Sequence, residues 1–509
     1  MNHNIEHLNR TFQLMEAMNK ITFFCGFILL VLLICPIVTA YDSRAVQFYN
    51  EGSDFAILGQ YSKAITSYDK AIAINSNYYE AWNERGVALR DLGLYAEAVA
   101  SFDKAITINP NIAQVWSNRG AALNYLGRYT EAVASYDKAI AINSTIAEVW
   151  NRRGVTLYNL GKYSEAITSY DKVIAINPDD AAVWNNRGIT LSELGQYSEA
   201  LASVNQAIAL NPNYAIAWNR RGIVQSQLGL NEDAIASYDK AIAINPEYAE
   251  AWNNRGVAQD NLSRYTEAVV SYDKAITINP NSASVWYNRG NALNNLGKYS
   301  EAIVSFDKAI AINPEYAEAW NNRGYALNEP DQYSEALVSF DKAIAINPNL
   351  AVAWNNRGFR QALLGQYSEA LVSSDKAIGI NPNSAEIWDT RGYALNGLGR
   401  YSEAVDSYDK AIAINSNISD VWNHRGVTLY NLGRYSEAVA SYDKAIAINP
   451  NISDAKQNRK NALEKQSQAQ QTSATPLPQK TKPTPLLYAP ISAIVLIAGI
   501  SVWNRRRPL

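Results

Sequence analysis

The sequence contains few of the residues from which metal centres and nucleophilic active sites are built. There are only three histidines, His3, His7 and His424, and two cysteines, Cys25 and Cys35. Imidazoles and thiolates are common ligands of transition metals and common partners of catalytic hydroxyls. Both cysteines lie in the first apolar stretch, so the rest of the chain has no thiol for disulfide bonds. We therefore expect no metal site and no disulfide framework.

An excess of charge of one sign is also missing. The net charge is -3 over 509 residues, and no long run of like charges occurs. A nucleic-acid groove needs a basic stripe, so we expect no nucleic acid among the partners. No glycine-rich phosphate loop and no isolated pair of carboxylates stands apart from the repeated pattern described below. We predict that the chain is not an enzyme and uses no cofactor and no small-molecule substrate.

Tryptophan, in contrast, recurs at a fixed interval of 34 residues. Eleven of the 12 tryptophans follow this interval without insertion or deletion: Trp82, Trp116, Trp150, Trp184, Trp218, Trp252, Trp286, Trp320, Trp354, Trp388 and Trp422. Phe48 takes the place one interval earlier, and Lys456 marks where the pattern decays. Such a period indicates an array of stacked units rather than several separate domains. We count twelve repeats over residues 45–452.

Each repeat is numbered here so that its tryptophan is position four. The first half carries apolar or small residues three or four apart, which is typical of one face of a helix. A Leu-Gly-x-Tyr sequence follows, as in residues 296–299, and its glycine can take the left-handed conformation that ends a helix. Ser300 is then expected to cap a second helix, with Glu301 in its first turn. Asn-Pro ends this second helix because proline cannot continue it, so each repeat is predicted to be a helical hairpin.

The residues at fixed positions resemble those of a known family. In one repeat they are Trp82, Gly86, Ala98, Phe102, Ala105 and Pro110, at positions 4, 8, 20, 24, 27 and 32. This pattern resembles the tetratricopeptide repeat over most of the chain. The resemblance implies an all-α fold, a right-handed α-solenoid of tandem helix-turn-helix hairpins. It also implies that the first helices line a concave groove that binds proteins or peptides.

Position seven departs from the family pattern. It is usually leucine in the family, but here it is arginine in eleven repeats, from Arg85 to Arg425. We favour a structural role in which each guanidinium meets the aspartate of position 25, such as Asp273, because a buried arginine needs such a partner. A cationic inner groove for acidic ligands is the alternative.

Two further departures are local. Val204 and Ser374 replace the aromatic residue of position 24. The sequence Glu-Pro-Asp at residues 329–331 disturbs one turn, because proline has no N–H to donate. We predict a local irregularity near Pro330.

Asparagine recurs at position six, which faces the inner groove in this family. The residues are Asn50, Asn118, Asn186, Asn254, Asn288, Asn322 and Asn356, which we call the asparagine ladder. Each carboxamide is both donor and acceptor, so a row of them can hold the main chain of an extended peptide. This pattern predicts a peptide-binding surface. The alternative is that asparagine is a solvated residue copied when the repeat was duplicated.

A second candidate surface is aromatic. Position nine, also on the inner groove, is mostly Val, Ile or Ala, but it becomes Tyr325, Phe359 and Tyr393 in three successive repeats. Tyr287 lies one repeat earlier, at position five. We call these four residues the aromatic strip, and a row of exposed rings would anchor a partner protein or peptide. The alternative is that they are larger core residues without exposure.

Residues 1–40 are predicted to be a signal peptide or signal-anchor. Lys20 precedes an almost wholly apolar run over residues 21–39, and small residues lead to Ala40. A basic flank, an apolar core and a small-residue exit are typical of a cleaved signal peptide. The run is also long enough to span a bilayer, so an uncleaved anchor is the alternative.

The residues after 452 predict a membrane anchor. A polar helix over residues 453–466 is expected to cap the array, and residues 467–485, rich in Pro, Gln and Thr, are expected to be a linker. Residues 486–503 are apolar and long enough to form a transmembrane helix, and the arginines of residues 504–509 should form a cytoplasmic tail. A removable sorting signal is the alternative for this tail. We expect the cell membrane as the location, single-pass after signal cleavage, with the repeats extracytoplasmic.

Together these features predict a non-enzymatic scaffold for protein–protein interaction on the outer side of the cell membrane. Proteins or extended peptide segments would bind in the concave groove. A structural spacer of the cell envelope without a defined ligand is the first alternative. An accessory subunit of a surface glycosylation or export complex is the second, and it rests on family analogy alone.

Overall fold

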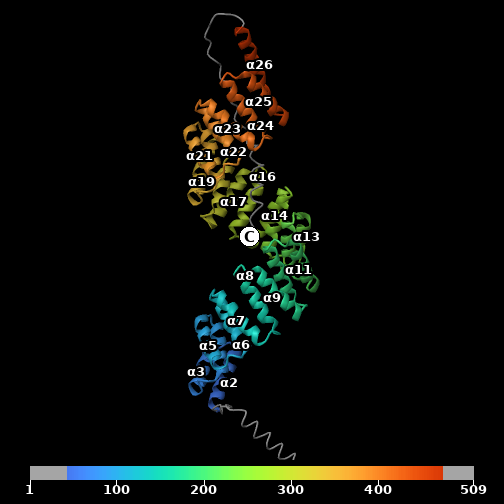
Figure 1. Cartoon of the computed structure of the whole chain (residues 1–509), viewed down its shortest axis with the longest axis vertical. Coiled ribbons are helices and arrows are strands. Elements are labelled where there is room, and N and C mark those ends of the chain that lie inside the picture. The colour runs from blue at the N-terminus through green and yellow to red at the C-terminus, as the bar shows by residue number, and fades with distance from the viewer. Residues whose placement is uncertain (1–42, 474–509) are drawn as a thin grey trace, which may run out of the picture. The chain divides into compact units, whose positions relative to one another are not determined.

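The computed structural model describes residues 43–473, and this part of the chain consists of helices joined by short turns, without strands (Figure 1). Twelve helical hairpins follow one another, and one further helix comes after them. The hairpins form two compact units, which divide between Pro212 and Asn213. The predicted fold, an α-solenoid of tandem helix-turn-helix hairpins, is confirmed.

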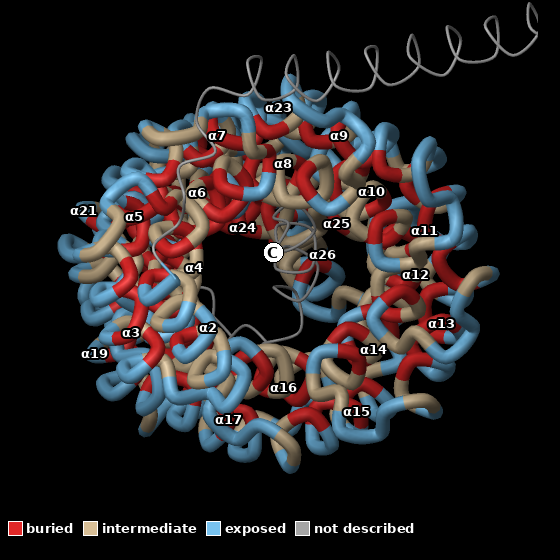
Figure 2. The backbone as a smooth tube through the Cα atoms, turned by 90° about the horizontal axis from the view of Figure 1, so that it is seen from below, coloured by how far each residue is buried: buried red, intermediate tan, exposed pale blue. Residues whose placement is uncertain are grey.

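The first unit contains five hairpins. Its helices are α2 (Ser43–Ile57), α3 (Tyr61–Ile74), α4 (Tyr79–Asp91), α5 (Tyr95–Ile108), α6 (Ala113–Tyr125), α7 (Tyr129–Ile142), α8 (Ala147–Asn159), α9 (Tyr163–Ile176), α10 (Ala181–Glu193) and α11 (Tyr197–Leu210). Within this unit, the two helices of a hairpin pack together, and the second helix also packs on the first helix of the next hairpin. The first helices α4, α6, α8 and α10 lie on the inner side of the unit's curve (Figure 2).

The second unit contains seven hairpins and the final helix. Its elements are α12 (Ala215–Gln227), α13 (Asn231–Ile244), α14 (Ala249–Asn261), α15 (Tyr265–Ile278), α16 (Ala283–Asn295), α17 (Tyr299–Ile312), α18 (Ala317–Ala326), the 3-10 turn η1 (Pro330–Gln332), α19 (Tyr333–Ile346), α20 (Ala351–Leu363), α21 (Tyr367–Ile380), α22 (Ala385–Gly397), α23 (Tyr401–Ile414), α24 (Ser419–Asn431), α25 (Tyr435–Ile448) and α26 (Ser453–Ser473). Here too the first helices, such as α14 and α16, lie inside, and the second helices, such as α15 and α17, lie outside (Figure 2).

The turn within a hairpin depends on a glycine at position 15. Gly297 has a φ of 72°, in the left-handed region that side chains disfavour. Lys298 N then donates to Leu293 O over 2.9 Å, and Lys298 O accepts the first hydrogen bond of the next helix, from Ala302 N over 3.0 Å. The turn therefore leads directly into α17.

This geometry corrects one prediction about the second helix. Ser300 was expected to cap it, but α17 begins at Tyr299, and the residue before it makes no side-chain cap hydrogen bond. Ser300 thus lies inside the first turn. Glu301 also lies in the first turn, as predicted, where a negative charge is favourable.

The predicted irregularity near Pro330 is confirmed. Helix α18 has 10 residues, whereas the first helices α16 and α20 each have 13. Pro330 begins a 3-10 turn in place of the missing helical turn. The N–H of Glu329 donates to Gln332 Oε1 over 3.4 Å rather than back into the helix.

The core of a hairpin is formed where glycine at position eight meets the aromatic ring at position 24. A Cβ on Gly290 would lie 2.5 Å from Cε1 of Phe306, so no larger residue fits without movement. In α21 the ring is replaced by Ser374, whose hydroxyl is buried and donates to Ala370 O over 2.8 Å. There α20 packs more extensively on α22 than other successive first helices of this unit pack on each other.

The repeated tryptophan holds the loop that leads into its own helix. Trp252 Nε1 donates to Pro246 O over 3.0 Å. The same bond, to the residue six places earlier, is made by Trp82, Trp116, Trp150, Trp184, Trp286, Trp320, Trp354, Trp388 and Trp422. The fixed period thus reproduces a fixed loop geometry.

The arginine at position seven is structural, as favoured above. Arg255 Nε donates to Asp239 Oδ1 of the preceding repeat over 2.7 Å, and its Nη1 donates to Ser271 Oγ of its own repeat over 2.8 Å. Its guanidinium also lies 5.8 Å from the ring centroid of Trp252. Equivalent ion pairs join Arg85, Arg119, Arg153, Arg187, Arg289, Arg323, Arg357, Arg391 and Arg425 to position 25 of the repeat before.

The final helix caps the array but is longer than predicted. Ala455 and Ala462 of α26 are buried against α25, and Arg459 pairs with Asp443 over 2.5 Å. Helix α26 continues to Ser473, beyond the expected end at residue 466, because Gln, Ser and Ala continue a helix and no proline interrupts it before the end of the described residues. Residues 467–473 are therefore helical rather than linker.

The predicted signal (residues 1–40), the transmembrane helix (residues 486–503) and the cytoplasmic tail (residues 504–509) lie outside the described residues. Within residues 43–473, none of the helices combines the length and the apolar character needed to cross a bilayer.

Candidate functional site

The asparagine ladder lies along the first helices, but most of its amides are hydrogen-bonded to the residue at position five of the preceding repeat. Asn254 Nδ2 donates to Asn219 Oδ1 over 3.2 Å, and Asn288 Nδ2 donates to Asn253 Oδ1 over 3.1 Å. The same bond, from position six to position five of the preceding repeat, is made by Asn118 and Asn356. Two adjacent rows of carboxamides therefore cross-link successive first helices.

The members of the asparagine ladder differ in how far they are exposed to solvent. Asn118, Asn254, Asn322 and Asn356 are only 5–7% exposed. Asn186 and Asn288 are partly exposed, and Asn50 is exposed. The alternative of a solvated, merely copied residue does not fit the four buried members. Peptide binding by the ladder stays a prediction, and Asn50, Asn186 and Asn288 are the members that a peptide reaches most easily.

Tyr287 is not part of an exposed strip, which corrects that part of the prediction. It is 7% exposed, and its ring centroid lies 4.9 Å from that of Tyr316 and 6.0 Å from that of Phe306. Its hydroxyl accepts a hydrogen bond from Asn322 Nδ2 over 3.1 Å. Position five points between hairpins, so Tyr287 joins the core and takes the place of an asparagine in the cross-link.

The other three aromatic residues are each partly exposed on successive first helices, α18, α20 and α22. The ring centroids of Phe359 and Tyr393 are 6.5 Å apart. Tyr393 in turn meets His424 of α24 edge to face, with the centroids 5.9 Å apart. A row of rings thus extends across three helices, and burial raises the pKa of Tyr393 to about 12, which keeps its phenol neutral.

Arg360 lies beside this row and was not singled out from the sequence. It is 6% exposed, and its guanidinium lies 4.9 Å from the ring centroid of Tyr333 and 5.9 Å from that of Phe359. Its Nη2 donates to Asn328 Oδ1 over 3.0 Å and to Tyr325 O over 3.4 Å. Burial lowers the pKa of Arg360.

The shortened helix explains why an arginine is placed there. Because α18 ends at Ala326, the carbonyl of Tyr325 lacks the N–H that a further helical turn would supply. Arg360, from the next repeat, supplies a donor and a positive charge at this helix C-terminus, where both are favourable. The signal in the sequence was the large polar residue at position ten, which is small or apolar in most other repeats.

His424 ends the row of rings and is part of a small polar cluster. Its Nδ1 lies 2.9 Å from Asp389 Oδ1 of the preceding repeat, and Asp420 lies one turn earlier on α24. Burial acts to lower the pKa of His424, but the charges of Asp389 and Asp420 and the hydrogen bond to Asp389 outweigh it and raise the pKa. Burial also raises the pKa of Asp420. The cluster therefore favours a protonated imidazole.

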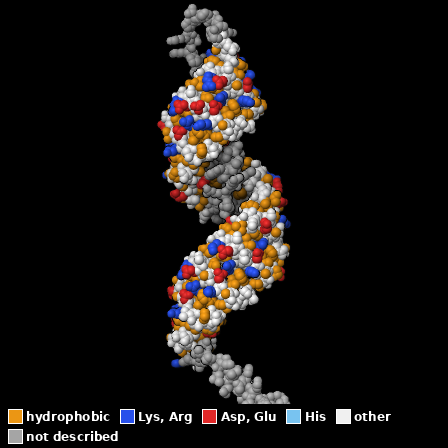
Figure 3. Space-filling model, in the orientation of Figure 1, with side chains coloured by type: hydrophobic (Ala, Val, Ile, Leu, Met, Phe, Trp, Pro, Cys, Tyr) orange, Lys and Arg blue, Asp and Glu red, His pale blue; other side chains and the backbone are white. Residues whose placement is uncertain are grey.

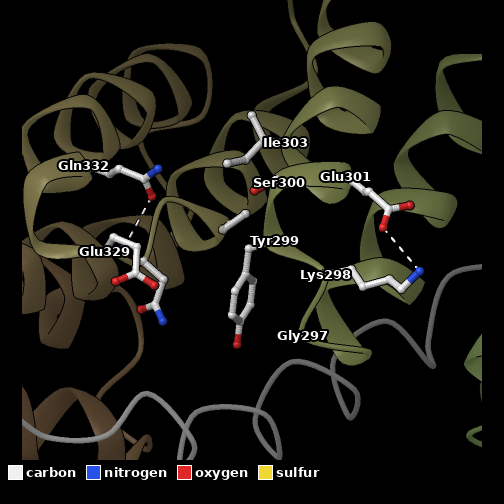
Figure 4. Close-up of a pocket in the computed structure, with 10 residues that line it drawn as sticks. Gly297, Lys298, Tyr299, Ser300, Glu301, Ile303, Glu329 and Gln332 are labelled. Carbon is white, nitrogen blue, oxygen red and sulfur yellow. Dashed lines mark hydrogen bonds and ion pairs between the residues drawn. The ribbon is translucent and has the colours of Figure 1, made fainter.

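An open cavity of about 310 Å³ lies beside the shortened helix, lined by the start of α17 and by the segment from Ala326 to Gln332 (Figure 4). The ring of Tyr299 lies between η1 on one side and Lys298 and Glu301 on the other (Figure 4). Lys298 Nζ pairs with Glu301 Oε1 over 3.2 Å at its rim. The cavity occupies the place of the turn that α18 lacks.

The surface carries no marked field of one sign on the side drawn in Figure 3, where acidic and basic side chains are interspersed on each unit. Within residues 43–473, no group of three or more His, Cys, Asp or Glu side chains is arranged to hold a metal ion. The inner face therefore carries rings, amides and the pair of His424 with Asp389, an arrangement that suits the binding of another chain.

Known proteins share this architecture. Solved structures similar to the chain include the APC/C hetero-tetramer Cut9-Hcn1 (14% identity, 85% of this chain and 99% of that chain, TM-score 0.46) and yeast Tom70 (16% identity, 85% of this chain and 97% of that chain, TM-score 0.38). YrrB, described as a TPR protein with an unusual peptide-binding site, is 26% identical over 36% of this chain and 95% of its own, with a TM-score of 0.32. A search of curated proteins found no match.

Family models match the chain at many of its repeats. A tetratricopeptide repeat model matches residues 147–180, 249–282, 283–316, 317–350 and 419–452, and a second matches residues 49–113 and 185–249. A TPR repeat model matches residues 120–161 and 392–433. The matched segments together span more than half of the sequence, with the period and the hairpins described above. The chain belongs to the tetratricopeptide repeat family.

Proposed function

We propose that the chain is a non-enzymatic scaffold that binds an extended segment of a partner protein on the inner face of its second unit. The segment would lie across α18, α20, α22 and α24. Proteins built of these repeats generally act as scaffolds for other proteins, and the fold supports this class of function.

The observation that carries the proposal is the pair of partly exposed rings of Phe359 and Tyr393, which the buried ring of His424 supports from behind. Partly exposed aromatic side chains are the residue type that most often anchors a protein interface. Here they are held in place before any partner arrives, because Arg360 lies over Phe359 and Asp389 holds His424. Rings that are already ordered lose little entropy on binding, which favours affinity.

The test uses the full chain on intact cells. A photo-crosslinking amino acid in place of Phe359 should capture a discrete partner, and the triple variant Tyr325→Val, Phe359→Val, Tyr393→Val should lose that partner. Valine is the residue that the array itself uses at position nine, for example Val87 and Val155, so the variant should fold. Tyr125→Ala, which removes an exposed ring of the first unit, is the matched control and should retain capture. Equal capture by the triple variant would refute the proposal.

We further propose that the repeats lie outside the cell membrane, held by residues 486–503 after cleavage of the signal in residues 1–40. The apolar runs and the arginines of residues 504–509 support this topology. Protease added to intact cells should then digest the repeats. If the repeats were fully protected from the protease until the cells were lysed, the proposed topology would be refuted.

A structural spacer is the competing function, and one observation favours it. The ion pair from position seven to position 25 recurs with little variation within each unit, as a mechanical element of uniform strength would require. If photo-crosslinking yields no discrete partner and single chains extend in equal force steps, the spacer replaces the scaffold. The third possibility, an accessory subunit of a glycosylation or export complex, would be recognised by the identity of the captured partner.

A further inference from the structure

One loop of the first unit carries an acceptor motif for N-linked sugars. It joins α7 to α8 and contains Asn143, Ser144 and Thr145, all of which are exposed. Sugars are transferred to the asparagine of Asn-x-Ser or Asn-x-Thr, provided that x is not proline. Residues 43–473 contain three further motifs of this form, which begin at Asn261, Asn417 and Asn451. The structure distinguishes the motif of Asn143 from the other three.

Thr145 holds the side-chain amide of Asn143 in a tight turn. The backbone N–H of Thr145 donates to Asn143 Oδ1 over 3.0 Å, and its hydroxyl donates to the same oxygen over 2.8 Å. Within the described part of the chain, no acceptor is bonded to Nδ2 of Asn143. The oxygen of this amide is therefore fixed, and its nitrogen stays available on an exposed loop.

The same turn recurs along the array, but one repeat alone completes the motif in it. Asparagine occupies position 31 in all twelve repeats. In the repeats of Asn245 and Asn313, for example, its Oδ1 accepts the backbone N–H of position 33 over 3.1 Å. Position 33 is Asn, Asp or Glu in eleven repeats, which have no hydroxyl there, and position 32 is proline in nine. Ser144 and Thr145 thus convert a structural turn into an acceptor.

The motif of Asn261 has different surroundings. Asn261 is the last residue of α14 and is partly buried. Its Nδ2 donates to Oδ1 of Asn231, the first residue of α13, over 3.4 Å. A sugar on this nitrogen would displace the contact between the two helices.

The motifs of Asn417 and Asn451 are exposed but lack the fixed amide. Their third residues, Ser419 and Ser453, are the first residues of α24 and α26. The hydroxyl of Ser453 donates to Asp454 Oδ1 over 3.3 Å. In the described residues, neither serine donates to the asparagine of its own motif. These two motifs therefore have the sequence of an acceptor without the turn.

We propose that Asn143 is modified by an N-linked oligosaccharide. Its Nδ2 attacks C1 of a sugar carried by a lipid-linked glycosyl phosphate, which a separate transferase of the cell envelope binds. The N–C bond forms as the C1–O bond to the phosphate breaks. The lipid phosphate leaves with the electron pair, and one Nδ2 proton passes to a base of the transferase. The hydroxyl of Thr145 favours the loss of this proton, because it stabilises the negative charge that develops on Oδ1.

The inference rests on the proposed function in one respect, the extracytoplasmic position of the repeats, because secreted chains are the ones that receive such sugars. It does not depend on the partner. Asn143 lies in the first unit, whereas Phe359 and Tyr393 lie in the second.

The experiment is mass spectrometry of peptides from the full chain, isolated from the membranes of its own cells. The peptide that contains Asn143 should carry the mass of an oligosaccharide, and the peptide that contains Asn261 should carry none. The fraction of modified chains at Asn417 and at Asn451 should be at least threefold lower than at Asn143.

The array supplies a matched pair of variants. Ser144→Pro introduces the residue that nine other repeats have at position 32, so it should fold, and the carbonyl of residue 144 can still accept from Trp150 Nε1. It should lower the modified fraction at Asn143 at least tenfold. Ser416→Pro makes the same change in another repeat and should leave Asn143 modified. Thr145→Ala should also abolish the modification, whereas Thr145→Ser should retain it.

The outcomes separate this inference from the topology. If protease digests the repeats on intact cells but Asn143 is unmodified, the inference is wrong and the topology stands. If the repeats are protected and Asn143 is unmodified, both are wrong. Equal modification at Asn143, Asn417 and Asn451, or modification that survives Ser144→Pro, would overturn the role of the turn.

Discussion

Arg289 Nε donates to Asp273 Oδ1 over 2.6 Å, and Nη1 of the same guanidinium donates to Ser305 Oγ over 2.7 Å. The three residues lie on α16, α15 and α17, so one side chain connects a hairpin to the repeat before it. The side chain of Arg289 is 18% exposed and that of Asp273 is 50% exposed. A largely buried arginine with a solvated carboxylate partner keeps its charge balanced without removing both ions from water.

Arg289→Leu should therefore destabilise the second unit, although leucine is the usual residue of the family at position seven. The variant leaves Asp273 and the buried Ser305 without their donor, at a cost of about 1–2 kcal/mol. Faster hydrogen exchange of the amides of α16 and a lower denaturant midpoint would show this. Arg289→Lys keeps the charge but loses the planar fork, so it should give an intermediate effect. Unchanged exchange in the leucine variant would exclude the structural role.

The same substitution should have opposite effects at two glycines of the second unit. Gly290→Ala places a Cβ 2.5 Å from the ring of Phe306 and should cost about 1–3 kcal/mol. Gly379→Ala meets nothing within 4 Å on the exposed side of α21 and should stabilise by about 0.5–1 kcal/mol, because alanine loses less backbone entropy in a helix. Chemical denaturation of both variants measures the change in the free energy of unfolding, which should be negative for Gly290→Ala and positive for Gly379→Ala. Equal changes would contradict the packing described for position eight.

Ser263→Gly should stabilise the hairpin of α14 and α15. Ser263 has a φ of 60°, where other repeats have glycine with φ between 69° and 80°. A left-handed residue with a side chain costs roughly 1–2 kcal/mol, of which glycine recovers part because its unfolded state is more flexible. We expect a gain of about 0.5–1 kcal/mol in the free energy of unfolding. Gly297→Ser, the reverse change in the next repeat, should lose a similar amount.

Asp260 should make the second unit less stable as the pH rises from about 4 to 7. Burial raises the pKa of Asp260 to about 7 in the folded chain, where Tyr272 donates to its Oδ2 over 2.7 Å. In the unfolded chain the Asp260 carboxyl loses its proton near pH 4. Between pH 4 and pH 7 the unfolded state therefore binds fewer protons than the folded state, and the free energy of unfolding falls as the pH rises. Above pH 7 the loss is constant.

Asp260→Asn should remove this dependence and raise stability at pH 8 by on the order of 2–4 kcal/mol. Asparagine occupies the same position in other repeats, for example Asn294 and Asn396, and its oxygen can still accept from Tyr272. Denaturant titrations of both proteins at pH 4.5 and pH 8 supply the comparison. Parallel pH profiles for the two proteins would show that Asp260 ionises normally.

The repeat pattern predicted the parts of the fold that one repeat determines by itself. Glycine at position eight and the ring at position 24 are part of the family pattern that predicted the hairpin, and the structure shows that they meet within it. The ion pair of Arg289 with Asp273 was also predicted, because arginine at position seven and aspartate at position 25 recur together. Ser305, its second partner, was missed, although serine occupies position 23 in every repeat.

The contacts between repeats were harder to predict. Asparagine at position six is compatible with a free amide on a groove and equally with an amide bonded to the preceding helix. Only the separation of the two helices decides between them, and that separation depends on every side chain packed between them. Tyr287 belongs to the core for the same reason. The contacts of Arg360 depend on a helical turn lost one repeat earlier. Its own repeat shows an unusual residue at position ten, but not the carbonyl that this residue meets.

The contact of Arg289 with Asp273 and Ser305 also bears on how such a chain changes in length. Within each unit, the same residue types meet at the same positions from one repeat to the next. A deletion or duplication of one whole repeat in frame brings together an aspartate, an arginine and a serine that already match. Recombination between the near-identical coding segments can therefore lengthen or shorten the protein in single steps, each of which yields a chain that still folds.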